Sequence, residues 1–271
     1  MKKICVQNLC MIVTEQCNLK CEHCLRGQCS NRVMSDDVIE ATLDQVVAIC
    51  NLNICGGEPT LALDRLEKII DVIIEKQILV DAISVVINGT RYDGKFLDLL
   101  KYFDDEVFGR QRKKVIFSIS WDEYHHREVD RLNMRKQYIE NIKRYAESKY
   151  FYELNGLHGK LYREGNAELL DENLTVPYVP MRNIFTYAGK WGREDRENGL
   201  CNIGPMVSIS TQGIITDCNA SYEHQETIYN YGNVLNESIE EVLSKDCIVV
   251  KPKRFYKTLG KEMKAYFDYN G

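Results

Sequence analysis

The sequence predicts an α/β protein built around a parallel sheet. Strand-like and helix-like segments alternate along the chain to about residue 195, which is typical of strands joined by helical crossovers. The segment 82–87 is almost continuously apolar, as expected of a parallel strand covered on both faces. The length suits a partial (β/α)6 barrel over residues 1–195. Residues 196–271 then form a small α+β extension with a hairpin and a helix.

The elements of the barrel are expected in the following order. A strand over 4–13 comes first, and Ser35 is a suitable N-cap for the first helix. The apolar residues that follow recur at helical spacing, which predicts that this helix extends to about Cys50. The remaining pattern predicts strands at 52–55, 82–87, 115–120 and 151–154, and helices around 66–73, 96–102 and 138–145.

Three cysteines follow the first strand at a C-x3-C-x2-C spacing: Cys17, Cys21 and Cys24. Three thiolates suit three irons of a cubane 4Fe–4S cluster and leave the fourth iron without a protein ligand. An open iron can bind a small molecule, whereas a four-cysteine site is closed. The alternatives are three buried thiols or a zinc site.

A glycine-rich segment, Gly56-Gly57-Glu58-Pro59, comes about thirty residues later. The two glycines lack side chains, so a ligand can approach the backbone, and Glu58 can accept from an ammonium group. The alternative is an ordinary turn from a strand into a helix, with Pro59 opening the helix.

Together, the cysteine spacing and the GGEP segment resemble the radical SAM superfamily. The resemblance implies that Cys17, Cys21 and Cys24 ligate a 4Fe–4S cluster whose open iron chelates S-adenosylmethionine (SAM). One electron, from a donor such as flavodoxin or ferredoxin, then splits SAM to a 5′-deoxyadenosyl radical. It also implies that the segment 56–58 holds the methionine amino group.

Other polar residues are expected at the carboxyl ends of the barrel strands, where barrel enzymes gather their chemistry. Asn88 follows the strand 82–87, and Ser118 and Asp122 lie at the end of the strand 115–120. The resemblance makes Ser118, Ser120 and Asp122 candidates for binding SAM near its ribose and methionine carboxylate, with solvated loop residues as the alternative. Asn88 is a further candidate because of its place at a strand end. His125 or His126 can donate a proton to a substrate, although adjacent histidines also occur on charged surfaces.

The C-terminal part carries a second cysteine pattern. Cys201 and Cys218 flank a predicted hairpin whose turn contains Gly213, and a helix signal and Cys247 follow. This resembles the start of the SPASM or twitch extensions of radical SAM enzymes, in a truncated form. The resemblance implies a second iron–sulfur cluster at Cys201, Cys218 and Cys247. An empty site, or thiols that pack as small apolar residues, is the alternative.

Composition excludes several other classes of protein. The net charge of −5 provides no global basic field for nucleic acid, and no apolar run approaches the length of a membrane span. The strand-like N-terminus leaves no room for a signal peptide. With eleven cysteines, we therefore expect metal ligation in a reducing compartment, the cytoplasm.

The predicted function is that of a radical SAM enzyme whose radical abstracts hydrogen from a peptide or protein substrate. One alternative is a twitch-type dehydrogenase of a small molecule such as a sugar or aminocyclitol. A third hypothesis, from another class, is a non-catalytic iron–sulfur protein acting as a sensor or scaffold. Formation of 5′-deoxyadenosine distinguishes the two enzyme hypotheses from the non-catalytic one.

Overall fold

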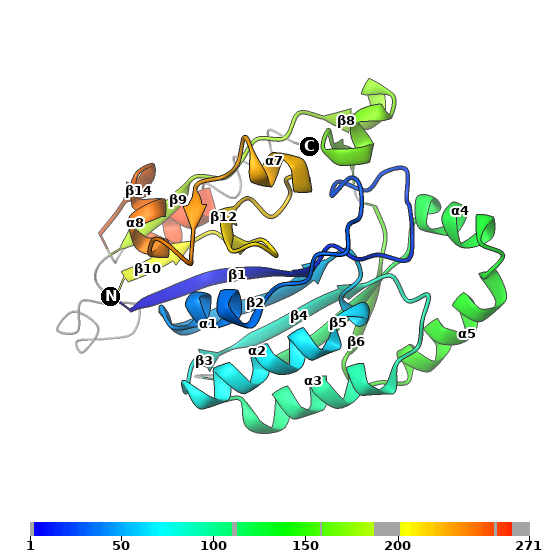
Figure 1. The fold of residues 1–271 in the computed structure, drawn as a ribbon, viewed down its shortest axis with the longest axis horizontal. Helices are drawn as coiled ribbons and strands as arrows, with labels where there is room; N and C mark the ends of the chain where they lie inside the picture. Colours follow the sequence, from blue (N-terminus) through cyan, green and yellow to red (C-terminus); the bar gives the residue numbers. More distant parts are fainter. Residues whose placement is uncertain (1–2, 110–112, 158, 187–200, 252–253, 262–271) are drawn as a thin grey trace.

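The computed structural model describes residues 3–109, 113–157, 159–186, 201–251 and 254–261 (Figure 1). They form a 12-stranded sheet whose main path runs β13-β12-β11-β1-β2-β4-β5-β6. The strands from the first half of the chain pair in parallel, as predicted. These strands are β1 (Ile4–Thr14), β2 (Val46–Gly56), β4 (Ala82–Ile87), β5 (Lys114–Ser120) and β6 (Phe151–Asn155), with the short β3 (Leu79–Val80) beside β2.

Helices connect the parallel strands, which confirms the α/β class and the partial barrel. They are α1 (Asp36–Leu43), α2 (Leu63–Glu75), α3 (Gly94–Glu106), α4 (Glu123–Arg131) and α5 (Arg135–Ala146). Figure 1 shows α1, α2 and α3 side by side along one face of the sheet. Apolar side chains such as Ile70, Phe96 and Leu100 are buried there against the strands, and this layer forms the main core.

The first helix is shorter than its apolar spacing predicts. Ser35 caps it as expected, because its hydroxyl accepts from the Val38 N–H at 3.4 Å. The helix ends at Leu43, however, and β2 already begins at Val46. The prediction that the helix extends to Cys50 was therefore wrong. The segment from Val46 is rich in β-branched residues, which favour a strand, and nine register pairs with β1 stabilise it there.

Helix α4 was not predicted, because its segment is strongly polar. Only Tyr124, Glu128 and Val129 of this helix are buried. It begins because the Asp122 carboxylate accepts from the backbone N–H groups of Tyr124 and His125 at 2.9 and 3.0 Å. The residues after β5 are therefore held in a helix start rather than in a solvated loop.

The C-terminal strands join the same sheet. β10 (Cys201–Gly204) and β11 (Val207–Ile209) both pair with β1 in parallel, and β11 forms the predicted hairpin with β12 (Ile214–Thr216). The boundary predicted near residue 195 lies outside the described residues. The other elements are η1 (Pro59–Leu61), β7 (Leu161–Tyr162), η2 (Gly165–Leu169), η3 (Glu172–Leu174), β8 (Thr175–Val176), β9 (Asn183–Thr186), α7 (Tyr222–Glu226), β13 (Gly232–Asn233), α8 (Ile239–Ser244) and β14 (Cys247–Val249).

The sheet face opposite to α1, α2 and α3 is lined with polar side chains. Alternate residues of neighbouring strands point to one face, and the register there pairs Asn8 with Asn51 and Asn53 with Ser84. The Asn51 amide donates to the side-chain oxygens of Asn8 (3.3 Å) and Asn53 (2.9 Å), and the Ser84 hydroxyl donates to Asn53 (2.6 Å). We call Asn8, Cys10, Asn51, Asn53, Cys55, Ser84, Val86, Asn88 and Ser120 the polar face.

Among the described residues, the structure contains no helix both long and apolar enough to span a membrane.

Candidate active site

The segment between β1 and α1, residues 15–34, carries the three predicted cluster ligands, and we call it the cysteine loop. Figure 1 shows it beyond the end of β1, near α4 on one side and α7 on the other. Cys21 is buried, and Cys17 and Cys24 are partly exposed. Cys21 and Cys24 line a cavity of about 220 Å³ together with Cys29 and Asn166. The loop therefore presents several thiols around one hollow.

The chemistry of these side chains fits an iron–sulfur cluster. Thiolates are soft ligands that suit iron–sulfur centres. Burial raises the pKa of the Cys21 thiol to about 12 and also raises the pKa of Cys24. A hydrogen bond with Cys29 raises the pKa of Cys17. Because coordination removes a thiol proton outright, thiols that are neutral without metal become ligands when iron binds.

The start of the cysteine loop docks directly on the two glycines. The Gly57 N–H donates to the Thr14 carbonyl and the Glu58 N–H donates to the Gln16 carbonyl, both at 2.7 Å. A Cβ on Gly57 would lie 2.2 Å from the Gln16 oxygen, and one on Gly56 would lie 2.4 Å from the Thr14 oxygen. Backbone thus takes the space that side chains would fill. The two glycines are therefore needed for a structural reason, because side chains at these positions would displace the cysteine loop.

Glu58 joins this segment to the end of β4. Its side chain is only 2% exposed. Its Oε1 accepts from the Thr60 N–H at 3.1 Å and hydroxyl at 2.6 Å, and its Oε2 accepts from the Asn88 N–H at 2.7 Å. Burial raises the pKa of Glu58, although these hydrogen bonds oppose the shift. Three of about four carboxylate acceptor positions are occupied, so one position on Oε2 is available for a ligand.

Asn88 continues the connection into the cysteine loop. Its amide donates to the Asn18 side-chain oxygen at 2.8 Å, and its Nδ2 lies 3.9 Å from the Cys17 sulfur. The Asn18 amide in turn donates to the Thr90 hydroxyl at 2.7 Å. Cys17, Glu58 and Asn88, three candidates far apart in the sequence, therefore meet at the carboxyl ends of β1, β2 and β4.

A second cavity, of about 200 Å³, lies beside these residues and opens onto the polar face. Gly56, Gly57, Glu58 and Asn88 all line it. Its other lining residues come from the cysteine loop, from β2, β4 and β5, and from the segment after β12: Leu25, Arg26, Cys55, Val86, Ile87, Ser120, Cys218 and Asn219.

The segment 164–166 packs against the middle of the cysteine loop and donates hydrogen bonds to it. The Asn166 side chain donates to the Cys21 carbonyl at 3.0 Å, and its backbone N–H donates to the Cys24 carbonyl at 2.9 Å. Gly165 has φ +56°, and a Cβ there would lie 2.4 Å from the Gly27 nitrogen. The buried Glu164 accepts from the Ser221 N–H and from His224, which links this segment to α7.

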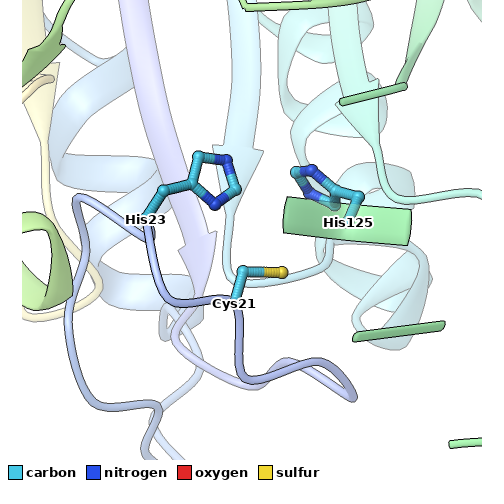
Figure 2. A group of neighbouring side chains, drawn as sticks. All are labelled: Cys21, His23 and His125. Carbon is cyan, nitrogen blue, oxygen red and sulfur yellow. The ribbon is translucent and has the colours of Figure 1, made fainter. Parts of the chain in front are cut away.

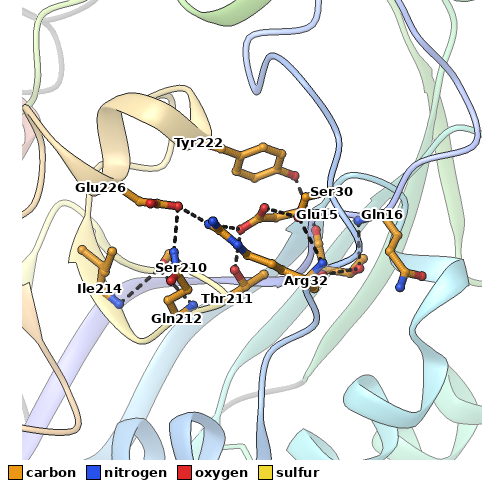
Figure 3. A network of polar contacts seen from close by, with 11 residues as sticks. Glu15, Gln16, Ser30, Arg32, Ser210, Thr211, Gln212, Ile214, Tyr222 and Glu226 are labelled. Carbon is orange, nitrogen blue, oxygen red and sulfur yellow. Dashed lines mark hydrogen bonds and ion pairs between the residues drawn. The ribbon is translucent and has the colours of Figure 1, made fainter.

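The hairpin turn of the C-terminal part holds the two ends of the loop together (Figure 3). The buried Glu15 accepts from the Ser30 hydroxyl at 2.7 Å and from the Thr211 hydroxyl at 2.6 Å. Arg32 forms an ion pair with Glu226, which also accepts from Gln212 at 2.7 Å. The C-terminal strands therefore help to position the loop as well as extend the sheet.

Histidines pack against the other side of the predicted cluster ligands. A ligand atom of each of Cys21, His23 and His125 lies within 4.8 Å of the others, and Figure 2 shows their arrangement. The His125 Nδ1 lies 2.5 Å from the Asp122 carboxylate, and the His23 Nε2 lies 3.5 Å from it. Burial opposes ionisation of Asp122, but its hydrogen bonds to both rings lower its pKa well below the usual range.

Asp122 is therefore engaged with α4 and with two histidines. Ser118 lies within β5 and is paired with Val86 and Glu153, nearly buried at 9% exposure. Their assignment to SAM binding stays a prediction. His126 packs edge-on against Trp121 at 4.3 Å between ring centroids, and its Nε2 is buried without a hydrogen-bond partner.

The structure does not bring Cys201, Cys218 and Cys247 together. Cys201 is paired with Ile4, six residues before Cys10 on β1, whereas Cys218 contacts Cys10. At about 3.3 Å per residue, this separates Cys201 from Cys218 by roughly 20 Å. Cys247 lies two strands away from Cys201, on β14, where it pairs with Asn183 of β9. A cluster shared by these three would need a different arrangement of the strands.

Two residues near the first site were not singled out from the sequence. The Cys29 thiol hydrogen bonds with that of Cys17. Arg26 is 9% exposed and lines the second cavity. No sequence pattern points to either role, because Cys29 lies outside the C-x3-C-x2-C spacing and the contacts of Arg26 are with residues far away in the sequence.

Comparison with known families identifies the class of protein. The model of the Radical SAM superfamily matches residues 11–164, more than half of the chain, so the protein belongs to this superfamily. Its cofactors are a 4Fe–4S cluster and SAM. No curated protein matches the chain.

Two kinds of solved structure are similar to the chain. One is native anSMEcpe with bound AdoMet and Cp18Cys peptide, at 15% identity and a TM-score of 0.46, covering 88% of this chain and 80% of that chain. Another is SuiB of Streptococcus suis bound to precursor peptide SuiA, at 13% identity and a TM-score of 0.39. The match covers 88% of this chain and 64% of SuiB.

The contact between Gly57 and the cysteine loop generates the first prediction. Gly57→Ala places a methyl group against the Gln16 carbonyl, so the loop must move, at a cost of roughly 1–3 kcal/mol. We expect reduced iron per chain after anaerobic reconstitution, while far-UV circular dichroism still shows a folded α/β protein.

Gly94→Ala is the matched control, because a Cβ at Gly94 meets nothing within 4 Å. It should retain the wild-type iron content. Full iron content in Gly57→Ala would contradict the proposed role of this close contact.

Proposed function

We propose that this protein is an enzyme that reductively cleaves SAM to a 5′-deoxyadenosyl radical and directs it to a peptide or protein substrate. The observation that carries the first part is the meeting of Cys17, Glu58 and Asn88 at the strand ends beside one cavity. In this proposal Cys17, Cys21 and Cys24 hold the cluster, and SAM occupies the cavity lined by Gly56, Gly57 and Glu58.

Glu58 is proposed to receive the methionine ammonium of SAM. It is buried, it lines the cavity, and one acceptor position of its Oε2 is not used by Thr60 or Asn88. A carboxylate in this environment binds an ammonium through a charge-assisted hydrogen bond. The bonds from Thr60 and Asn88 fix the carboxylate before SAM binds, so little ordering cost remains.

The cysteine loop is also suited to electron delivery. Cys17 and Cys24 are partly exposed and Cys29 is exposed, so a small electron carrier such as flavodoxin or ferredoxin can approach the cluster. The buried His23 and the half-buried His125 and Asp122 close the other side of the cysteines. In this proposal the electron enters the cluster from the exposed side of the loop, and the radical forms in the cavity beside Glu58.

A peptide substrate is supported by the polar face. Between Asn51 and Cys55 it extends about 13 Å along β2, and from β1 to β5 it extends about 14 Å across the strands. Its amide side chains can both donate and accept, as a peptide backbone does. Cys55, Val86 and Ser120 belong both to this face and to the cavity. A bound peptide would thus reach the SAM site, and Val86, 40% exposed, offers it an apolar contact.

The cysteines provide the first test of this function. Changing Cys17, Cys21 and Cys24 to Ala removes the thiolates that would hold the irons, so 5′-deoxyadenosine formation from SAM with dithionite should be abolished. The product is measured by liquid chromatography under anaerobic conditions. Product formation by this variant at the wild-type rate would refute the assignment, and so would wild-type protein that contains a full cluster and forms none.

Glu58 provides the second test. Glu58→Gln keeps the shape of the side chain but removes its charge, so SAM affinity should weaken by roughly 1.5–3 kcal/mol, the range for hydrogen bonds to charged groups. Isothermal titration of the reconstituted protein measures the SAM Kd.

Thr60→Val is the control for Glu58→Gln, because it removes one hydrogen bond to Glu58 and leaves the charge in place. Its effect on SAM affinity should be clearly smaller. Equal losses in the two variants would show that Glu58 acts only through local structure.

A further inference from the structure

Three cysteines that no motif connects come together below the second cavity. Cys10 lies in β1, Cys55 at the end of β2, and Cys218 after β12. The Cys10 and Cys55 sulfurs are 3.2 Å apart, and the Cys10 thiol also hydrogen bonds with Cys218. Cys10 is 4% exposed, while Cys55 and Cys218 keep some exposure and line the cavity. We call these residues the inner thiols.

A buried cation lies against the inner thiols. Arg26 is 9% exposed, and its guanidinium donates to the Ala220 carbonyl at 2.9 Å and to the Cys55 sulfur at 3.6 Å. Cys10, Cys218 and Tyr222 are also among its electrostatic neighbours, and Asp217 interacts with it from the segment after β12. A buried charge is costly unless it is compensated. The position of Arg26 therefore favours negative charge at the inner thiols.

The strand register argues against a disulfide between Cys10 and Cys55. Cys10 is paired with Asn53, so Cys55 lies two residues further along the neighbouring strand. A spacing of about 4.8 Å between strands and about 6.6 Å along them separates the two Cα atoms by roughly 8 Å. Disulfides require about 7 Å or less without backbone movement. Cys10 and Cys55 are therefore better suited to act as two separate sulfur ligands than to form a disulfide.

We propose that Cys10, Cys55 and Cys218 form a second metal site, which binds a thiophilic transition metal as a single ion or as an iron–sulfur cluster. Metal–sulfur bonds of about 2.3 Å place tetrahedral sulfur ligands about 3.8 Å apart, so the side chains need to rotate only modestly toward a common ion. Three thiolates on a divalent ion carry a net charge of −1, which the Arg26 guanidinium compensates.

The residues around the inner thiols indicate which way the open coordination position of this metal would face. Cys55 and Cys218 line the same cavity as Gly57 and Glu58. A metal held by three protein ligands keeps one position for water or substrate. At the inner thiols, that position would face the cavity, between the predicted SAM site and the polar face. The metal would then be placed to hold a polar group of the substrate.

The test isolates the inner thiols from the first site. The parent variant carries Ala at Cys17, Cys21, Cys24 and Cys29, which removes every thiol that lines the first cavity or contacts it. The protein is reconstituted anaerobically with Zn²⁺ in one sample and with Fe²⁺ and sulfide in another. Metal and labile sulfide per chain are then measured after desalting, with circular dichroism as a check on folding. Because the parent variant lacks the cluster needed for SAM cleavage, its result is independent of the proposed function.

The expected result is stoichiometric metal in the parent variant. About one Zn²⁺, or iron with equimolar sulfide, would support the site and identify its occupant. Adding Cys10→Ala or Cys218→Ala should lower metal retention by at least about tenfold, since loss of even an outer-sphere partner costs 10–100-fold. Cys247→Ala, which changes a thiol outside the inner set, should retain the metal.

Either of two outcomes would overturn the proposal: a folded parent variant without metal, or unchanged metal retention after Cys10→Ala. If metal is lost after Cys247→Ala as well, the second outcome would support the C-terminal ligand set instead.

Discussion

The close packing of the cysteine loop on Gly56 and Gly57 is the constraint on which the site depends. The loop contains little regular structure, so its shape is set by its partners. Two backbone hydrogen bonds, from Gly57 to Thr14 and from Glu58 to Gln16, continue the pairing of β1 with β2 beyond the ends of the strands. They can form only where no side chain intervenes. The same contact puts Glu58 beside the cysteines. The C-x3-C-x2-C motif and the GGEP segment, which are far apart in the sequence, are therefore neighbours in the fold.

The rest of the molecule supports this contact from several directions. Asn166 fixes the middle of the loop, Thr211 of the hairpin turn binds Glu15 at its start, and Asn88 connects it to β4. The C-terminal strands therefore serve the site through the sheet and through direct contacts. The polar face continues from the same strand ends. Packing apolar residues on the helical side of the strands leaves the opposite side available for polar recognition, because side chains alternate along each strand.

Much of the fold could be predicted because local signals agreed with the tertiary structure. The strand Ala82–Ile87, the cap at Ser35 and the hairpin around Gly213 were all predicted and are all present. The errors arose where two patterns compete. Val46 and Cys50 match a helical repeat as well as a strand, and pairing with β1 decides the outcome. Helix α4 has too few apolar residues to be recognised from its periodicity, and the capping hydrogen bonds of Asp122 decide where it begins.

The candidate site was predictable only where its chemistry is local in sequence. Cys17, Cys21 and Cys24 lie within eight residues, and Gly56 to Glu58 are consecutive. The inner thiols are not local: Cys10 and Cys55 are 45 residues apart, and Cys218 comes from the opposite half of the chain. Only the folded structure shows that they meet. Conversely, Cys201 and Cys218 match a family spacing, yet strand pairing places them far apart.

In the proposed function, the cysteine loop presents an iron that SAM binds directly. Electron paramagnetic resonance of the reduced, reconstituted protein, recorded with and without SAM, tests this binding. We predict that SAM changes the spectrum of the reduced 4Fe–4S cluster, because it adds ligands to one iron. Identical spectra at saturating SAM, from protein that contains a full cluster, would contradict the account.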